Sequence, residues 1–174
     1  MNKQEIINAL KSRHQVFADY ILQLPEDEFL QQLPGKWSAG QQLDHIFRAV
    51  RPVTLAFGLP FFMLKLFFGK SNRPGRSYDE LVTKYKDKLA AGGVASGRFI
   101  PAPIKLSDRL NLAKSLNTKV GKLCNEVEKY TEEQLDILIL PHPLLGKLTM
   151  REMLYFTMYH VDHHLALTKR NLAA

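Results

Sequence analysis

Residues 106–130 read LSDRLNLAKSLNTKVGKLCNEVEKY, and they give the clearest helical signal in this 174-residue chain. The apolar residues of the stretch recur at steps of three or four, which places them along one stripe of an α-helix. They are Leu106, Leu110, Ala113, Leu116, Val120, Leu123, Val127 and Tyr130. Ser107 or Asp108 can cap the start of the helix with a side-chain oxygen. We therefore predict a long helix that buries this stripe in the core.

Three further long helices are predicted from the same kind of periodicity. They cover residues 3–22, 39–56 and 150–171. Ser38 and Thr149 stand just before the last two of these segments, where a hydroxyl oxygen accepts hydrogen bonds from free backbone N–H groups. Four principal helices without a convincing sheet indicate an all-α protein built as a helical bundle.

The connection over residues 57–104 is expected to hold extra short helices. Ser77 followed by Glu80 resembles a capping box, which predicts a polar helix over residues 76–91. Further along the chain, residues 138–143 are expected to be extended, because prolines interrupt any helix there. A turn at Gly146-Lys147-Leu148 then leads into the last helix, and no pairing of strands is expected.

The apolar segment over residues 53–68 needs a separate interpretation, because residues 57–68 carry five phenylalanines. The segment is shorter than the ~20 residues that a membrane-spanning helix needs. Gly58, Pro60 and Lys65 also interrupt it. We therefore predict no membrane span and a buried helix–loop packed on the bundle. The alternative is an interfacial lid, or a patch that covers the mouth of a pocket.

Composition places the chain among ordinary globular proteins, since 45% of its residues are hydrophobic and 24% are charged. The net charge of +7 comes with lysines spread over helix faces and loops. No basic run is interleaved with aromatics, so no nucleic-acid partner is expected. The single cysteine, Cys124, cannot form an internal disulfide, and a small core residue is the favoured interpretation over a nucleophile. The first residues lack the pattern of a secretory signal, so we expect a cytoplasmic protein.

Three of the six histidines crowd one turn of the last helix, in the sequence YHVDHH at residues 159–164. Residues four apart share one face of a helix, so His160 and His164 can present both imidazoles to one metal ion. On a helical wheel with His160 at zero, His164 falls at about 40°, toward the apolar side, and His163 at about 300°, beside the polar residues. His164 is therefore the better second ligand, and His163 is better placed at the rim or as a proton carrier.

A third ligand must come from another helix. His45 lies at the edge of the apolar side of the 39–56 helix, a position from which metal sites in helical bundles are built. His14 on the first helix and His142 in a loop are weaker alternatives, although His142 can line the mouth of a pocket. The competing interpretation is that these histidines are hydrogen-bonded core residues or surface residues and bind no metal.

Several short motifs resemble the DinB/YfiT-like superfamily, and the likeness spans nearly the whole chain in order and spacing. The motifs are Trp37-Ser38, Gln42-Leu43 and His45-Ile46, followed by residues 142–149 (HPLLGKLT) and 160–165 (HVDHHL). The chain is most similar to a poorly characterised branch of that superfamily.

The resemblance implies one domain over residues 1–174, folded as an up-down-down-up four-helix bundle. It also implies one divalent metal ion held by His45, His160 and His164. Zinc or nickel is the expected ion, with iron or manganese as alternatives. Many relatives carry glutamine three residues after the last ligand; this chain has Leu167, so no polar role is expected there.

Three neutral imidazoles leave positions on a metal ion open, as in catalytic rather than structural zinc sites. Characterised relatives include thiol-dependent transferases and metal-dependent hydrolases. We therefore expect an enzyme that hydrolyses a small molecule or transfers a low-molecular-weight thiol, with His163, Asp44 or His142 as candidate bases. The alternatives are a non-catalytic module that binds a small ligand or a partner helix, with a structural metal or none, and a metal-free bundle. The first or last helix offers an exposed side for a homodimer.

Overall fold

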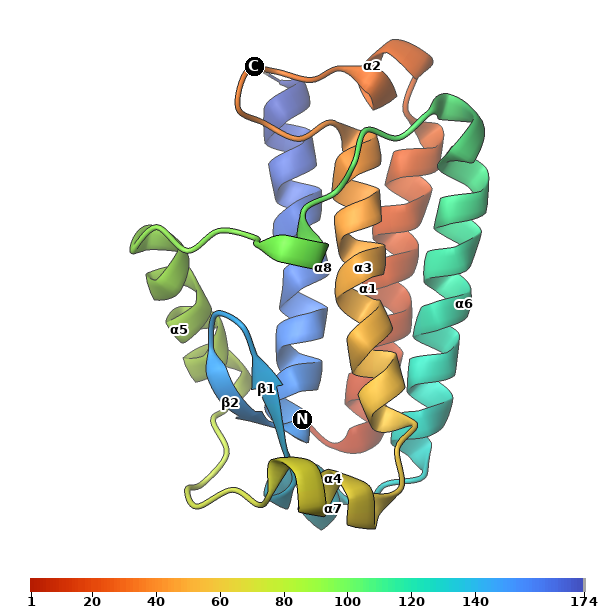
Figure 1. Cartoon of the computed structure of the whole chain (residues 1–174). Helices are drawn as coiled ribbons and strands as arrows, with labels where there is room; N and C mark the ends of the chain where they lie inside the picture. The colour runs from red at the N-terminus through yellow and green to blue at the C-terminus, as the bar shows by residue number, and fades with distance from the viewer. Residues whose placement is uncertain (174) are drawn as a thin grey trace.

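A computed structural model describes residues 1–173 of the chain, and its framework is four long helices packed side by side (Figure 1). They are α1 (Lys3–Gln23), α3 (Ala39–Phe57), α6 (Arg109–Glu128) and α8 (Met150–Leu172). Helices α1 and α8 run in one direction, and α3 and α6 run in the other (Figure 1). The prediction of an all-α protein is confirmed, because helices dominate and the described residues hold only one small two-stranded sheet.

The predicted N-terminal caps form at three helices. Ser38, Ser77 and Thr149 each accept a hydrogen bond from the backbone N–H three residues later, and the side chain at that later position bonds back to the cap. Such reciprocal capping boxes satisfy N–H groups that the start of a helix leaves free. At α6 the prediction of a side-chain cap is wrong. Asp108 stands at the cap position without a side-chain bond, and a short 3-10 turn, η2 (Leu106–Asp108), leads into the helix.

The apolar stripe predicted for residues 106–130 is buried along most of its length. Its buried members are Ala113, Leu116, Val120, Leu123, Val127 and Tyr130. Leu110, at the start of the helix, is an exception because it is 50% exposed. At the other end, the hydroxyl of Tyr130 donates to the backbone carbonyls of Phe57 and Leu59. This contact ties the end of α6 to the end of α3.

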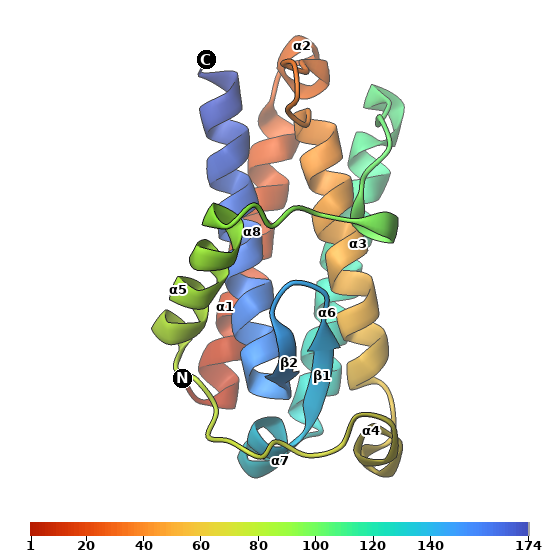
Figure 2. The same ribbon diagram turned by 60° about the vertical axis from the view of Figure 1, so that its left-hand side comes forward.

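Short helices close the ends of the framework and form the connection between α3 and α6. Helix α2 (Glu26–Leu30) follows α1, and α7 (Glu132–Ile137) follows α6. The connection holds α4 (Phe61–Phe68), α5 (Tyr78–Ala90) and a 3-10 turn, η1 (Gly97–Phe99), so the prediction of extra short helices there is confirmed. Helix α5 packs on α8, and the chain between α5 and η1 crosses in front of α8 and α3 (Figure 2).

Helix α4 is more exposed than its composition suggests. Only Leu64 is buried among its residues, whereas Phe62, Leu66 and Phe67 are 67%, 75% and 62% exposed. The prediction of a buried helix–loop is therefore wrong for this segment, because a helix that packs with one side can bury only one stripe. No single helix within residues 1–173 is long and apolar enough to cross a membrane, and α3 and α4 meet that test only as a pair bent by 109°.

A β-hairpin stands where the sequence predicts unpaired extended chain. Strand β1 (Ile139–His142) pairs antiparallel with β2 (Gly146–Thr149), and the turn lies at residues 143–145 rather than at 146–148. Gly146 has a φ of +77°, a left-handed value that suits glycine after a tight turn. Prolines do not prevent the pairing, because both strands of a two-stranded sheet are edge strands, where a missing N–H is tolerated.

A buried carboxylate ties the connection to the start of α8. Glu152 is 0% exposed and accepts hydrogen bonds from the guanidinium groups of Arg73 and Arg76. It also accepts bonds from the backbone N–H groups of Arg76 and Thr149. Burial acts to raise the pKa of Glu152, but these donors, with Arg73 foremost, hold the pKa below its usual value. The carboxylate therefore stays charged inside the protein.

Candidate metal centre

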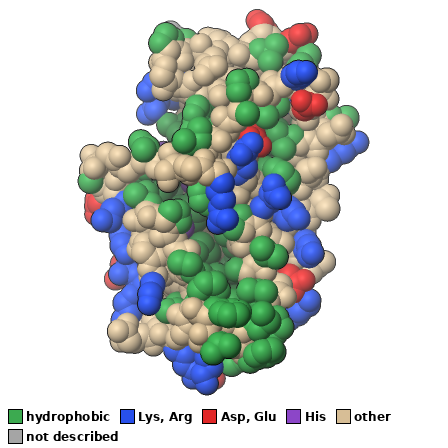
Figure 3. All heavy atoms as spheres, viewed as in Figure 1, with side chains coloured by type: hydrophobic (Ala, Val, Ile, Leu, Met, Phe, Trp, Pro, Cys, Tyr) green, Lys and Arg blue, Asp and Glu red, His purple; other side chains and the backbone are tan. Residues whose placement is uncertain are grey.

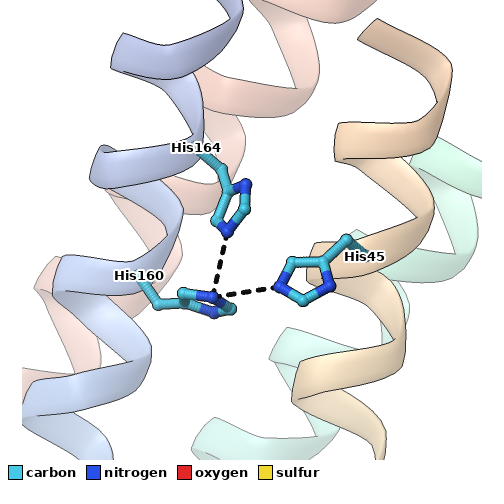
Figure 4. A group of neighbouring side chains, drawn as sticks. All are labelled: His45, His160 and His164. Carbon is cyan, nitrogen blue, oxygen red and sulfur yellow. Dashed lines mark hydrogen bonds between the residues drawn. The ribbon is translucent and has the colours of Figure 1, made fainter. Parts of the chain in front are cut away.

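The imidazoles of His45, His160 and His164 meet between α3 and α8 (Figure 4). His160 Nε2 lies 3.1 Å from His45 Nε2 and 3.1 Å from His164 Nε2. Each residue offers one ring nitrogen, and these three nitrogens all lie within 4.8 Å of one another. All three side chains are buried. The structure thus brings together the three histidines that the sequence and the resemblance select.

Helix α8 supplies two of these rings because His160 and His164 are four residues apart and share one face of the helix. The wheel's preference for His164 over His163 agrees with the structure. His164 is 5% exposed and belongs to the group. His163 is only half-buried, and its ring centroid lies 5.2 Å from that of His164.

The outer ring nitrogens of His45 and His164 face oxygen acceptors. His45 Nδ1–H donates to the backbone carbonyl of Phe99 at 2.7 Å, and His164 Nδ1–H donates to the side-chain carbonyl of Gln42. Since a neutral imidazole carries one N–H, the Nε2 atoms of both rings carry lone pairs that face His160 Nε2. Outer partners of this kind orient histidine ligands and raise their basicity.

Burial keeps the three imidazoles neutral. It lowers the pKa of His160 well below its usual value, with a further contribution from the His164 and His45 rings. Burial lowers the pKa of His164 well below its usual value too, aided by His45. The pKa of His45 is also lowered by burial, although the carbonyl of Phe99 acts in the opposite direction. Neutral imidazole is the form that binds metal ions.

A divalent cation fits this donor set better than hydrogen bonds alone. His160 Nε2 can give a proton to only one of the two lone pairs that face it, so one buried acceptor is left without a donor. Nitrogens bound tetrahedrally to zinc at about 2.0–2.1 Å are separated by about 3.3 Å. The two distances of 3.1 Å in the structure are close to that value. The residues present therefore fit a metal ion.

A pocket of about 960 Å³ opens onto the three histidines. Trp37 lines it, and the Trp37 ring centroid lies 4.9 Å from that of His45 and 6.2 Å from that of His164. Small-molecule pockets have volumes of about 300–1,000 Å³. The pocket therefore has room for a small molecule beside the histidines.

Two of the three candidate bases lie in this pocket. His163 and His142 line it, whereas Asp44 lies outside its lining and pairs with Arg48 at 2.6 Å. The Asp44 carboxylate is thus engaged by an arginine one helical turn away and does not face the pocket lining.

His142 has one defined tautomer. Its Nδ1 accepts hydrogen bonds from the backbone N–H groups of Leu144 and Leu145, so its Nε2 carries the proton. Burial, followed by the nearby Lys84, lowers the pKa of His142 to about 4. His142 therefore offers a neutral N–H donor to the pocket.

His14 and Cys124 lie in the core and not in the pocket lining. His14 Nδ1–H donates to the carbonyl of Leu10 at 2.8 Å, and burial lowers the pKa of His14 to about 4. Its Nε2 has no partner among the described residues. Cys124 is 1% exposed, and burial raises the pKa of its thiol to about 11. Both residues fit core positions, as the sequence predicts for Cys124.

Two partners of the histidines have roles that sequence reasoning does not assign. Gln42 stands three residues before His45, so both lie on the same side of α3, and this spacing is a signal that could have identified it. Phe99 contributes its backbone carbonyl, which no side-chain pattern marks. Its position depends on how the connection folds across α3.

The chain matches a known protein family over most of its length. A family model described as the DinB superfamily matches residues 9–167, which is nearly the whole chain. The matched region contains the three histidines, Gln42 and Phe99. No curated protein matches the chain.

Proposed function

We propose a function for this chain from the fact that it belongs to the DinB superfamily. His45, His160 and His164 bind one divalent metal ion through their Nε2 atoms, and the ion serves a reaction on a small molecule in the adjoining pocket. The observation that carries this proposal is the meeting of three buried, neutral ring nitrogens within 4.8 Å. Without a metal ion, the Nε2 lone pairs of His45 and His164 would have only the single Nε2 proton of His160 to share.

Three protein ligands favour a catalytic site, because structural zinc sites have four. The pocket of about 960 Å³ leaves room for water or substrate on the free side of such an ion. When bound, the ion would polarise a carbonyl group or lower the pKa of a water or a thiol. We propose hydrolysis or transfer of a low-molecular-weight thiol as the reaction, and zinc or nickel as the ion, since imidazole ligands suit both.

The pocket residues would position the substrate and exchange protons with it. The Nε2–H of His142 can donate a hydrogen bond to a substrate oxygen. His163 stands beside the ligands and is the candidate proton carrier. Trp37 packs near the rings of His45 and His164 and shields them from water.

Elemental analysis tests the metal site. Protein purified without chelators is expected to hold close to one divalent ion per chain. Chelator-treated protein is expected to take up one zinc or nickel ion and to melt at a higher temperature, because a ligand that binds only the folded state stabilises it. Protein that is metal-free and also fails to take up either ion would contradict the proposal. Turnover of small esters and thiol adducts by loaded but not by stripped protein tests the reaction.

Gln42→Leu is expected to weaken zinc binding by about 10–100-fold, because the carbonyl that orients His164 is lost. Competition with a chromophoric chelator measures the affinity. Gln42→Glu keeps an acceptor for His164 Nδ1–H and serves as the matched control, with an affinity close to the original one. Equal losses in both variants would show that the hydrogen bond has no role in binding.

A further inference from the structure

We propose that the pocket beside the histidines binds an amphipathic anion, with an apolar chain at one end and an anionic group at the other. This anion is also the substrate class that we infer for the proposed reaction, and in that role the inference rests on the proposed function. Binding of the anion depends only on the residues that line the pocket. Their apolar and cationic side chains lie at different positions along the length of the pocket.

One end of the pocket is apolar. The side chains there come from the end of α3 and the turn after it, from α4, from β1 and from the start of α8: Ala56, Leu59, Phe68, Leu140 and Met153. Because α3 and α8 run in opposite directions, the end of one lies beside the start of the other (Figure 1). Figure 3 shows hydrophobic side chains along the lower part of this hollow. Such a surface binds an aliphatic or aromatic group through the hydrophobic effect.

All the charged side chains that line the pocket are cationic. They are Lys36 before α3, Arg98 in η1 and Arg170 in the last turn of α8. Lys36 and Arg170 lie at the end of the framework opposite to Leu59 and Met153. Within residues 1–173, none of these three cations forms a salt bridge.

Acidic side chains do not offset this positive charge. No Asp or Glu of the described chain lines the pocket. On α3 and α8, which both line the pocket, Asp44 pairs with Arg48 at 2.6 Å, Asp162 with Arg13 at 2.6 Å and Glu152 with Arg73 at 2.7 Å. Unpaired cations at the rim of an apolar pocket attract an anionic group and repel a cationic one.

The three histidines lie between the apolar end and the end that carries Lys36 and Arg170, and Arg98 lies next to Phe99, whose carbonyl contacts His45. Along α3, His45 stands between Lys36 and Leu59, and along α8, His160 stands between Met153 and Arg170. A ligand that spans the pocket would therefore place the group that joins its tail to its head beside the histidines. The substrate class is an apolar chain linked through a reactive group to an anionic head.

Isothermal titration calorimetry with N-dodecanoylglycine tests this inference. Dodecyltrimethylammonium has the same tail with a cationic head, and N-acetylglycine has the head without the tail. Chelator-treated protein is used, so that the carboxylate of the probe cannot bind a metal ion. We expect one N-dodecanoylglycine per chain, bound at least about tenfold more tightly than either comparison probe. Equal or tighter binding of the cationic probe, or no binding of N-dodecanoylglycine, would overturn the proposal.

Variants locate the bound probe. Lys36→Glu combined with Arg170→Glu is expected to weaken N-dodecanoylglycine binding at least about tenfold, without changing the melting temperature, because both side chains are exposed. Lys114→Glu combined with Lys122→Glu reverses two exposed charges on α6, outside the pocket, and is the matched control. Ala56→Phe is expected to fill the apolar end and weaken binding as much. Binding that survives both the rim reversal and Ala56→Phe would place the probe outside the pocket and overturn the proposal.

The proposed pocket ligand and the proposed metal site can be refuted independently of each other. Metal content and zinc titration do not involve the probe, and probe binding to stripped protein does not involve the ion. Protein that binds the probe as expected but takes up no metal would refute the metal site alone. Protein that takes up zinc but does not bind the probe would refute the pocket assignment alone.

Discussion

His160→Ala is expected to lower the affinity for zinc by more than about 100-fold, since losing a partner outside the metal's own ligands already costs about 10–100-fold. His160 Nε2 is the atom that lies 3.1 Å from both of the other Nε2 atoms. Its removal leaves one candidate ligand on each of two helices, which is too few to hold the ion in competition with water and buffer. Competition with a chromophoric chelator and elemental analysis of the purified variant measure the loss.

His163→Ala is the matched control, because it removes the same kind of side chain from the same helix but outside the group of three. It is expected to keep its zinc. If His160→Ala loses turnover but, without metal, melts at the same temperature as the stripped original protein, the ion is catalytic. If His160→Ala no longer folds, the ion is structural. A zinc affinity equal to that of the original protein would contradict the assignment of His160 as a ligand.

Glu152→Gln is expected to lower the free energy of unfolding by about 3 kcal/mol. The variant keeps the shape of the side chain but leaves Arg73 and Arg76 without their anion. Removing one partner of a buried ion pair costs about 3–5 kcal/mol, and the lower end applies because the two arginine side chains are 31% and 29% exposed. Equilibrium unfolding in urea measures the change.

Glu80→Gln provides the matched control for Glu152→Gln. Glu80 occupies the same capping-box position in α5, but it is exposed, so a much smaller loss is expected. Because the folded protein holds the pKa of Glu152 below its usual value, its contribution to stability is present above the ordinary glutamate pKa of about 4.3. The stability difference between the original protein and Glu152→Gln should therefore shrink as the pH falls through the lowered pKa of the folded state. A difference that persists in acid would contradict the ion-pair interpretation.

Features that depend on neighbouring residues could be predicted from the sequence. The N-caps at Ser38 and Thr149 and the capping box of Ser77 with Glu80 each need only residues within three positions of one another. The pairing of His160 with His164 likewise follows from the helical repeat, and the same repeat separates both from His163. His45 is an intermediate case, because its helix could be predicted, but the meeting of that helix with α8 could be expected only from the resemblance. Its role as a metal ligand stays a prediction.

Features that depend on contacts between distant segments could not be predicted. The bond from His45 to the carbonyl of Phe99 requires the connection to cross α3 at the right height. The salt bridges of Glu152 require Arg73 and Arg76 to return to the start of α8. The exposure of α4 depends on which of its faces meets the framework, and a run of phenylalanines does not specify that face. Each of these outcomes is set by tertiary packing and not by local preference.

The positions of the histidines along the chain determine when an ion can bind during folding. His45 and His160 are 115 positions apart, whereas His160 and His164 lie on adjacent turns of one helix. An unfolded chain can therefore offer an ion only the local pair, and bringing in His45 requires closing a long loop against its entropy before any contact is gained. An ion held by all three histidines would enter only after α3 and α8 have docked. It would then prolong the lifetime of the folded chain by slowing unfolding, and would leave the rate of folding nearly unchanged.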